Sequence, residues 1–207
     1  MQGGKKYSDG MNICQRAIKR IFDIVCSLVG MLFLSPLFLY IYIKLRKQGD
    51  GPVIFKQERI GYKGKPFFIL KYRTMRVDAD DSEEPNLACK EDNRLTPFGR
   101  FLREHHLDEL PQLWNVLVGD MSFVGPRPER KFFIDKIMQH NPDYEYIYLM
   151  RPGLTSPASV YNGYTDTMEK MLIRLDMDLE YLQKRGLWLD IKIVFITVYS
   201  ILKGKKI

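Results

Sequence analysis

An uncharged apolar run from residue 24 to residue 43 constrains this chain more than any other feature, because it holds a proline in its middle. About 20 apolar residues are the minimum for a helix that crosses the hydrocarbon layer of a membrane. Pro36, which follows Ser35, removes one backbone hydrogen bond and clashes with the carbonyl one helical turn earlier, so we expect a sharp bend there. The run can therefore enter a bilayer, but it is poorly suited to crossing one as a straight helix.

Basic residues flank both ends of the run. They are Arg16, Lys19 and Arg20 before it, and Lys44, Arg46 and Lys47 after it. The positive-inside rule assigns both ends to the cytoplasm, which a helix that bends at Ser35-Pro36 and returns can satisfy. We therefore predict a re-entrant pair of half-helices over residues 15–47, with its basic residues against anionic lipid headgroups and Asp23 in the interface. A straight spanning helix and a buried core helix of a soluble protein are the alternatives.

The composition allows one globular domain plus this membrane element. With 207 residues, a formal net charge of +7 and an isoelectric point near 9.2, the chain suits an anionic partner. Charge alone does not distinguish nucleic acid from a phospholipid surface or a phosphorylated substrate, but its position beside the apolar run favours the membrane. The three cysteines have no paired spacing, which argues against a disulfide framework or a zinc site and fits a reducing cytoplasm.

Two adjacent carboxylates, Asp108 and Glu109, are predicted to lie at the start of a helix, where neighbouring side chains point about 100° apart. One carboxylate can then attack a substrate while the other holds a metal. Arg127 lies between Pro126 and Pro128, which fix the backbone, and its planar guanidinium suits phosphate oxygens. Together these residues indicate phosphoryl transfer. Acidic residues at a helix start are also explained by the helix dipole alone.

Two longer motifs contain these residues. Residues 108–113 read Asp-Glu-Leu-Pro-Gln-Leu, and residues 119–128 read Gly-Asp-Met-Ser-Phe-Val-Gly-Pro-Arg-Pro. In them the chain resembles the small phosphoglycosyl transferases of bacterial surface-glycan assembly, also called bacterial sugar transferases. The likeness continues at residues 52–55, 57–61, 71–75 and 151–155. We judge that it covers roughly residues 15–203.

The resemblance implies an enzyme that transfers a sugar-1-phosphate from a UDP-sugar to polyprenyl (undecaprenyl) phosphate and releases UMP. Such enzymes catalyse the first membrane step of surface-glycan assembly, at the cytoplasmic face of the bacterial inner membrane. The resemblance also implies that Asp108 is a nucleophile that forms a covalent sugar-phosphoryl intermediate, and that Glu109 is a ligand of Mg²⁺. The residues that it implies for substrate and phosphate binding are Lys71, Arg73, Arg103, Arg127 and Asp178.

The residues by themselves leave simpler explanations open. Lys71 and Arg73 could be solvated charges after a strand, and Asp178 could be an ordinary exposed carboxylate on a helix. The histidine pair at 105–106 lies in a predicted turn between helices, where capping or solvation is more common than catalysis. Asp120 is either a second metal ligand or, as we favour, a turn-forming aspartate.

The expected fold class is α/β and mostly helical: a re-entrant N-terminal membrane helix, a small β-hairpin and a helical catalytic domain with interfacial amphipathic helices. The hairpin is predicted over residues 52–75, with strands at 53–55 and 67–70, and the acidic stretch 78–92 is predicted as a surface loop. Residues 187–203 are predicted as an interfacial helix, although a buried core helix explains their apolar pattern equally well.

The chain divides into three predicted parts. They are a polar N-terminus (1–14), the re-entrant membrane helix broken at Ser35-Pro36 (15–47) and a cytoplasmic catalytic domain that ends in the interfacial helix (48–207). Within the last part, Thr96 and Pro97 have the pattern of a cap and first turn, so a helix is expected to begin there and to carry Arg103.

One departure from the family pattern affects the functional interpretation. After the motif at 151–155 the usual run is Gly-Trp-Ala-Gln-Val-Asn-Gly-Arg, whereas residues 156–164 lack the arginine and end in Tyr164. The sugar and the pathway therefore stay open. So do two other functions: a catalytically silent membrane-bound interaction protein of a glycan pathway, and a hydrolase that passes the phosphosugar to water. A nucleic-acid partner is not expected, because no binding motif accompanies the charge. The oligomeric state is open, a homodimer included.

Overall fold

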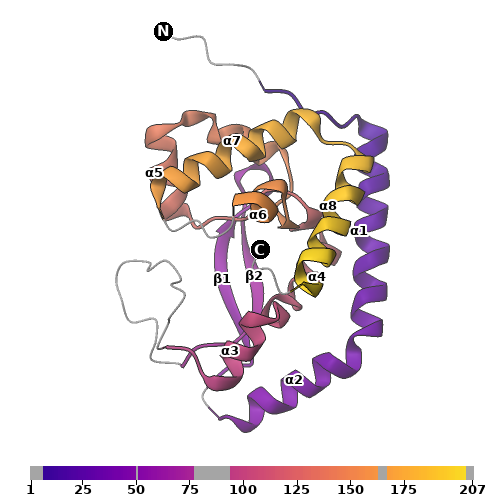
Figure 1. Cartoon of the computed structure of the whole chain (residues 1–207), viewed down its shortest axis with the longest axis vertical. Coiled ribbons are helices and arrows are strands. Elements are labelled where there is room, and N and C mark those ends of the chain that lie inside the picture. The colour runs from indigo at the N-terminus through magenta and orange to yellow at the C-terminus, as the bar shows by residue number, and fades with distance from the viewer. Residues whose placement is uncertain (1–6, 50, 77–93, 163–166, 204–207) are drawn as a thin grey trace.

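The computed structural model describes residues 7–49, 51–76, 94–162 and 167–203 (Figure 1). The α-helices are α1 (Ile13–Phe33), α2 (Ser35–Lys47), α3 (Pro97–Glu104), α4 (Gln112–Val118), α5 (Lys131–His140), α6 (Pro157–Asn162), α7 (Met168–Lys184) and α8 (Leu187–Leu202). The 3₁₀ helices are η1 (Tyr62–Gly64), η3 (Leu107–Glu109) and η4 (Pro142–Leu149), and the strands are β1 (Ile54–Ile60), β2 (Pro66–Tyr72), β3 (Ser122–Val124) and β4 (Gly153–Thr155).

The prediction of a mostly helical chain with a small antiparallel hairpin is confirmed. The predicted acidic loop 78–92 and Tyr164 lie outside the described residues.

Helices α1 and α2 form a pair bent by 62°, with Leu34 at the break (Figure 1). Pro36 lies in the first turn of α2, where backbone N–H groups have no partner within the helix. The N–H that proline lacks is therefore not needed there, and the chain resumes a helix directly after the bend. Taken singly, none of the helices described is both long enough and apolar enough to cross a membrane, whereas α1 and α2 meet that test as a bent pair. The predicted bend at Ser35-Pro36 is confirmed.

Charged side chains cover the face of α1 that points into the protein. Arg20 donates to the carbonyls of Val116 (2.6 Å) and Leu117 (2.7 Å), in the last turn of α4, where carbonyls lack donors within the helix. Lys19 donates to the carboxylate of Asp190 in α8 at 2.5 Å. The prediction that these two basic residues meet lipid headgroups is therefore wrong. The sequence shows their charge but not the direction in which that helix face points.

Asp23 lies on the same inward face. It is only 2% exposed and accepts a hydrogen bond from the backbone N–H of Phe123 in β3 at 3.1 Å. Its predicted interfacial position is wrong, because the carboxylate pairs with a strand of the folded domain.

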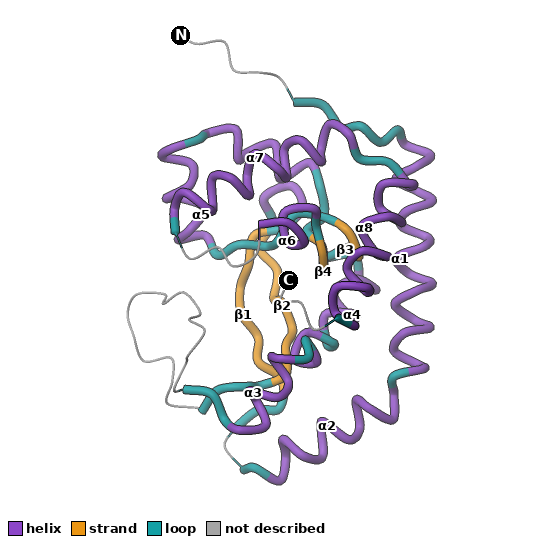
Figure 2. The backbone as a smooth tube through the Cα atoms, in the orientation of Figure 1, coloured by secondary structure: helices purple, strands orange, loops and turns teal. Residues whose placement is uncertain are grey.

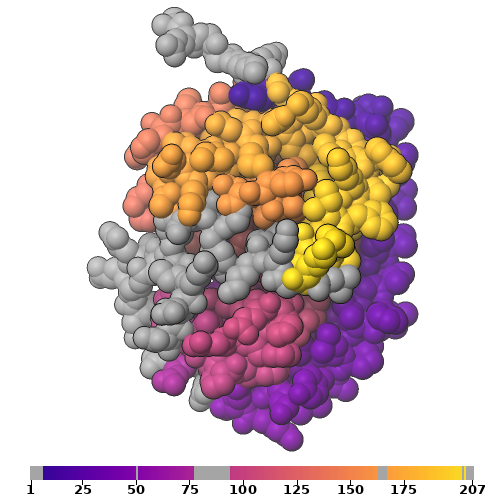
Figure 3. Space-filling model, viewed as in Figure 1, coloured from indigo at the N-terminus to yellow at the C-terminus, as the bar shows by residue number. Residues whose placement is uncertain are grey.

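The outward faces of α1, α2 and α8 are apolar. Their exposed large side chains include Val25, Leu28, Val29, Leu32, Phe33, Leu39, Trp188, Phe195 and Val198. Helix α8 lies along α1, as Figure 3 shows for the yellow and purple surfaces, and the Lys19–Asp190 contact joins the two helices. The predicted helix at 187–203 is confirmed as a helix, with Ile193 buried in the core and Trp188 81% exposed.

Strands β1 and β2 pair antiparallel, with Ile54 opposite Tyr72 at one end and Ile60 opposite Pro66 at the other. Both strands are longer than predicted, because backbone pairing continues through polar residues that the apolar pattern does not mark. Lys71 therefore lies within β2 and not after its end.

Two short parallel strands, β3 and β4, hold the loop that carries Arg127 (Figure 2). The N–H of Gly125 donates to the carbonyl of Thr155, and the N–H of Gly153 donates to the carbonyl of Pro126, each at 2.9 Å. A Cβ on either glycine would collide with the backbone of the other segment, so this crossing requires glycine on both sides. Two motifs that are distant in the sequence are thereby locked together at Arg127.

Hydrophobic clusters support these elements. One cluster joins α5, η4 and α7 through Phe133, Ile134, Ile137, Tyr144, Ile147, Leu175, Leu179 and Leu182. A second cluster packs α2 against the hairpin and α3 through Ile41, Leu45, Val53, Tyr72 and Leu102. A third packs β2 against α4 and the residues after it through Phe67, Ile69, Val116 and Met121. The bend after α1 thus places α2 against the elements that carry the candidate site.

Candidate active site

The carboxylate dyad, Asp108 and Glu109, lies in the 3₁₀ helix η3. Helix α3 ends at Glu104, His106 begins η3 as its N-cap with a φ of 54°, and the next α-helix, α4, begins only at Gln112 after Pro111. The prediction of an α-helix start at the dyad is therefore wrong. In a 3₁₀ helix neighbouring side chains are about 120° apart, so the two carboxylates still point in different directions.

Glu109 forms an ion pair with Lys71, whose ammonium lies 2.6 Å from Oε1. Burial alone would raise the pKa of Glu109, but the positive charges of Lys71 and Arg127 outweigh burial and lower this pKa to about 2. Glu109 is therefore a carboxylate throughout the physiological pH range. The structure brings Lys71, Glu109 and Arg127 into one electrostatic group, as the sequence motifs suggested.

Asp108 is the more deeply buried member of the dyad, at 6% exposure. Burial raises the pKa of Asp108 above its ordinary value, and the charge of Glu109 raises it further, while Lys71 and Arg103 act in the opposite direction. The environment thus pushes the two pKa values apart. Such a separation is typical of paired carboxylates that take different chemical roles.

Arg103 and Arg73 have different surroundings. Arg103, on α3, donates through Nε to the hydroxyl of Thr74 at 3.2 Å and is close enough to lower the pKa of Asp108. Arg73 is buried, and its Nη2 donates to the carbonyl of Leu45 in α2 at 3.1 Å. The structure therefore places Arg103 at the dyad and gives Arg73 a tie to the bent helix pair.

Asn115, on α4, is a site residue that the sequence analysis missed. Its Oδ1 accepts from the N–H of Leu70 at 3.0 Å, and its Nδ2 donates to the carbonyl of Phe68 at 2.8 Å and to Asp120 at 3.3 Å. The amide therefore pairs with the open edge of β2 directly before Lys71. Asp120 supports Asn115, which is a third role beside the two that the sequence left open. A lone buried asparagine carries no sequence signal of such a contact.

A second group of charges, which we call the inner cluster, consists of Arg59, Glu129, Arg174 and Asp178. Glu129 is held from both sides, by Arg174 at 2.5 Å and by Arg59 at 3.5 Å. Burial lowers the pKa of Arg59 to about 10. Three of these residues were missed, because they come from separate elements and no spacing in the sequence connects them.

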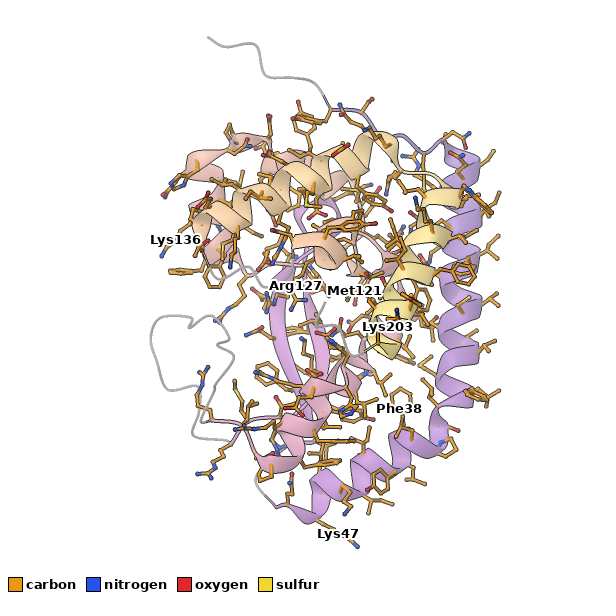
Figure 4. All side chains as sticks on the ribbon, viewed as in Figure 1. Phe38, Lys47, Met121, Arg127, Lys136 and Lys203 are labelled. Atoms are coloured by element: carbon orange, nitrogen blue, oxygen red, sulfur yellow. The ribbon has the colours of Figure 1, made fainter. Side chains whose placement is uncertain are left out.

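Asp178, on α7, belongs to the inner cluster and is 4% exposed. Burial raises its pKa to about 7, although Arg174 and a hydrogen bond with Ser156 lower it. Together with Arg127, it lines a pocket whose other walls come from η4, α5 and α7. Figure 4 shows Arg127 in the middle of the molecule, beside the hairpin. The alternative of an exposed helix carboxylate for Asp178 is therefore wrong.

The two histidines have different surroundings. His106 lies close enough to the dyad to act toward a lower pKa of both Asp108 and Glu109. The Nδ1 of His105 lies 2.9 Å from the carbonyl of Phe101 at the end of α3, which agrees with the capping interpretation. Among the described residues no group of three or more histidine, cysteine or acidic side chains is arranged to hold a metal ion.

Carboxylates surrounded by lysine and arginine are residues of the kind that sites for phosphate groups use. Comparison with known families identifies the class further. The chain matches the bacterial sugar transferase family over residues 14–204, and it belongs to that family.

Individual relatives carry names that specify a reaction. The chain is 40% identical over 196 residues to UDP-glucose:undecaprenyl-phosphate glucose-1-phosphate transferase of Escherichia coli. The aligned region covers 94% of this chain and 42% of the relative. It is 42% identical to a Caulobacter vibrioides protein of the same name, covering 89% of this chain and 69% of the relative. It is 38% identical to UDP-N-acetylgalactosamine-undecaprenyl-phosphate N-acetylgalactosaminephosphotransferase of Aeromonas hydrophila, covering 90% and 44%. The chain thus spans less than half of the first and third of these relatives.

Proposed function

We propose that this protein transfers a sugar-1-phosphate from a UDP-sugar to undecaprenyl phosphate and releases UMP, at the cytoplasmic face of the bacterial inner membrane, where surface-glycan assembly begins. The observation that carries the proposal is the dyad: an ionised Glu109 paired with Lys71 beside a buried, more basic Asp108. The reactions named for the E. coli and Aeromonas relatives support it.

The reaction takes place in two displacements. An Asp108 oxygen attacks the phosphorus that carries the sugar, the bond to the bridging oxygen breaks, and UMP leaves with that oxygen. A phosphate oxygen of the lipid then attacks the same phosphorus and frees the Asp108 carboxylate. The raised pKa of Asp108 makes it the better nucleophile of the two carboxylates once it is ionised. Lys71, Arg103 and Arg127 neutralise the phosphate oxygens.

Glu109 is the proposed ligand of Mg²⁺. Its pKa near 2 keeps its hard oxygen donors charged, and Lys71 contacts Oε1. A single carboxylate is sufficient for Mg²⁺, which takes its other ligands from water and substrate phosphates. The ion would neutralise diphosphate charge. We expect that a chelator abolishes UMP release and that added Mg²⁺ restores it; full activity in excess chelator would contradict this assignment.

The apolar outward faces of α1, α2 and α8 are proposed to enter one leaflet. Since Lys44, Arg46 and Lys47 end α2, a re-entrant pair keeps both of its ends on the same side. We expect single cysteines introduced as Asn12→Cys and Gly49→Cys, in a background without Cys14, Cys26 and Cys89, to react with an impermeant maleimide in inverted vesicles and not in intact spheroplasts. Labelling of Gly49→Cys from the periplasm would show a straight crossing instead.

UMP release over a panel of UDP-sugars tests the reaction. With a covalent intermediate, the protein without lipid phosphate should release a single equivalent of UMP per molecule, and added undecaprenyl phosphate should give sustained turnover. Sustained release without lipid, together with free sugar-1-phosphate, would indicate a hydrolase. Absence of release with every donor, despite binding to a glycan-pathway protein, would indicate the catalytically silent interaction protein.

A further inference from the structure

We propose that the pocket lined by Arg127, Arg174 and Asp178 receives one hydroxyl group of the donor substrate, and that Asp178 accepts a hydrogen bond from it. The inference rests on the proposed function and assigns a recognition role within the same site.

An unpaired oxygen supplies the first argument. Oδ1 of Asp178 is buried and has no hydrogen-bond partner, while the side chain as a whole forms a hydrogen bond with Ser156. A buried carboxylate oxygen without a donor is unfavourable, so such an atom is retained where a ligand or a water completes it. When Asp178 is ionised, this oxygen requires a hydrogen-bond donor, which a fully ionised phosphate cannot supply.

The size of the pocket supplies the second argument. It leaves about 20 Å³ for the centre of a water-sized group, and roughly 10 to 15 Å³ is sufficient for one water molecule. A hydroxyl group therefore fits, whereas a complete sugar ring does not. Pro126, Ile137 and Ile147 supply apolar parts of the pocket wall.

The two carboxylates of the inner cluster differ in their partners. Glu129 is held by Arg59 and Arg174, so the negative charge of the inner cluster is already paired except at Asp178. A hydroxyl group donates a hydrogen bond without adding charge, which matches the pocket.

The position of Arg127 links the pocket to the reacting phosphate. Arg127 lines the pocket and also lowers the pKa of Glu109, so it lies between the inner cluster and the dyad. A phosphate held by Arg127 would carry its attached sugar to the mouth of the pocket. In a UDP-sugar both the transferred sugar and the ribose are attached to a phosphate and carry hydroxyl groups. Either can be the source.

Ser156 indicates why this chain could differ in selectivity from other members of the family. It is the first residue of the run that departs from the usual family motif, and its hydroxyl contacts Asp178. Where the usual motif has glycine, no side chain can make this contact. The orientation of Asp178, and hence the hydroxyl that it accepts, would depend on Ser156.

The experiment combines changes in the donor substrate with changes in the protein. The donor that gives the fastest UMP release is compared with analogues in which each hydroxyl, on the transferred sugar and on the ribose, is replaced in turn by hydrogen. In the unaltered protein one replacement should lower kcat/KM about 10- to 100-fold, the effect of one hydrogen bond to a charged group. In Asp178→Ala the same replacement should lower kcat/KM by less than about threefold. The volume-conserving Asp178→Asn should show an intermediate decrease in kcat/KM.

Matched controls separate recognition from folding. Asp176→Ala alters an exposed aspartate on the same helix and should leave every deoxy penalty unchanged. Thermal unfolding of Asp178→Asn shows whether the variant is folded. The hydroxyl whose removal loses its effect in Asp178→Ala is the one that the pocket receives. Its position shows whether the pocket binds the transferred sugar or the ribose. Equal penalties in all variants at every position, in a protein that still releases UMP, would overturn the pocket assignment and leave the proposed function intact.

Discussion

The dyad and the inner cluster solve the same electrostatic problem in two different ways. In each, a glutamate is paired with cationic side chains, Glu109 with Lys71 and Glu129 with two arginines, and an aspartate nearby has a pKa raised by burial. The dyad lies on one short turn of sequence and next to a strand, whereas the inner cluster is assembled from β1, α7 and the segment before α5, which are far apart in the chain. The difference suggests that the first group is arranged for reaction and the second for recognition.

The largest effect should come from removing the nucleophile. Asp108→Asn should lower sustained UMP release by at least about 10³-fold, because the covalent step is lost while binding contacts remain. Asp178→Asn should still form a sugar-phosphoryl adduct, measured as an increase in intact mass after mixing with the donor. Asp135→Asn, at an exposed position, serves as the control. An adduct that persists in Asp108→Asn would place the nucleophile elsewhere.

A smaller effect should distinguish the dyad from the inner cluster, because Asn115 supports only the strand beside the dyad. Asn115→Leu removes the amide that pairs with Leu70 and Phe68, so the strand that carries Lys71 should shift. We expect kcat to fall about 10- to 100-fold, since misplacement by about 1 Å has an effect of this size, and the midpoint of thermal unfolding to fall by several degrees.

The deoxy-donor penalties should stay unchanged in Asn115→Leu, because the inner cluster does not contact this amide. If Asn115→Leu instead abolished the penalty at the recognised hydroxyl, the dyad and the pocket would form a single unit.

The smallest expected effect concerns stability and pH. Asp178 has a pKa of about 7 in the folded protein against an ordinary value of 3.8. Between pH 3.8 and about 7 the carboxyl is therefore protonated in the folded state and ionised in the unfolded state. The contribution of Asp178 to stability is therefore greatest at the acidic end and is lost as the pH rises from 3.8 to about 7. Thermal midpoints of Asp178→Asn, in which the group does not titrate, should rise relative to those of the unaltered protein over this range. Parallel curves would contradict the raised pKa.

Local sequence accounted for much of the fold. Ser35-Pro36 predicted the bend, Thr96 predicted the cap of α3 through its side-chain bond to the N–H of Gly99, and apolar strands around glycines predicted the hairpin. These features depend on residues within one or two turns of each other, so the chain shows them directly. The α-helix predicted at the dyad failed, because His106 adopts a left-handed backbone that only the packed turn determines.

The chain's sequence alone established a bent apolar segment, a pair of carboxylates and an arginine held between prolines, since each is a contiguous pattern with a local physical cause. Only the tertiary structure decided that Arg20 ties α1 to α4, that Asn115 holds the strand of Lys71, and that Asp178 faces a pocket with a free oxygen. Those contacts join residues far apart in the chain. Burial and pKa depend on which segments pack together, and no single segment specifies its partners.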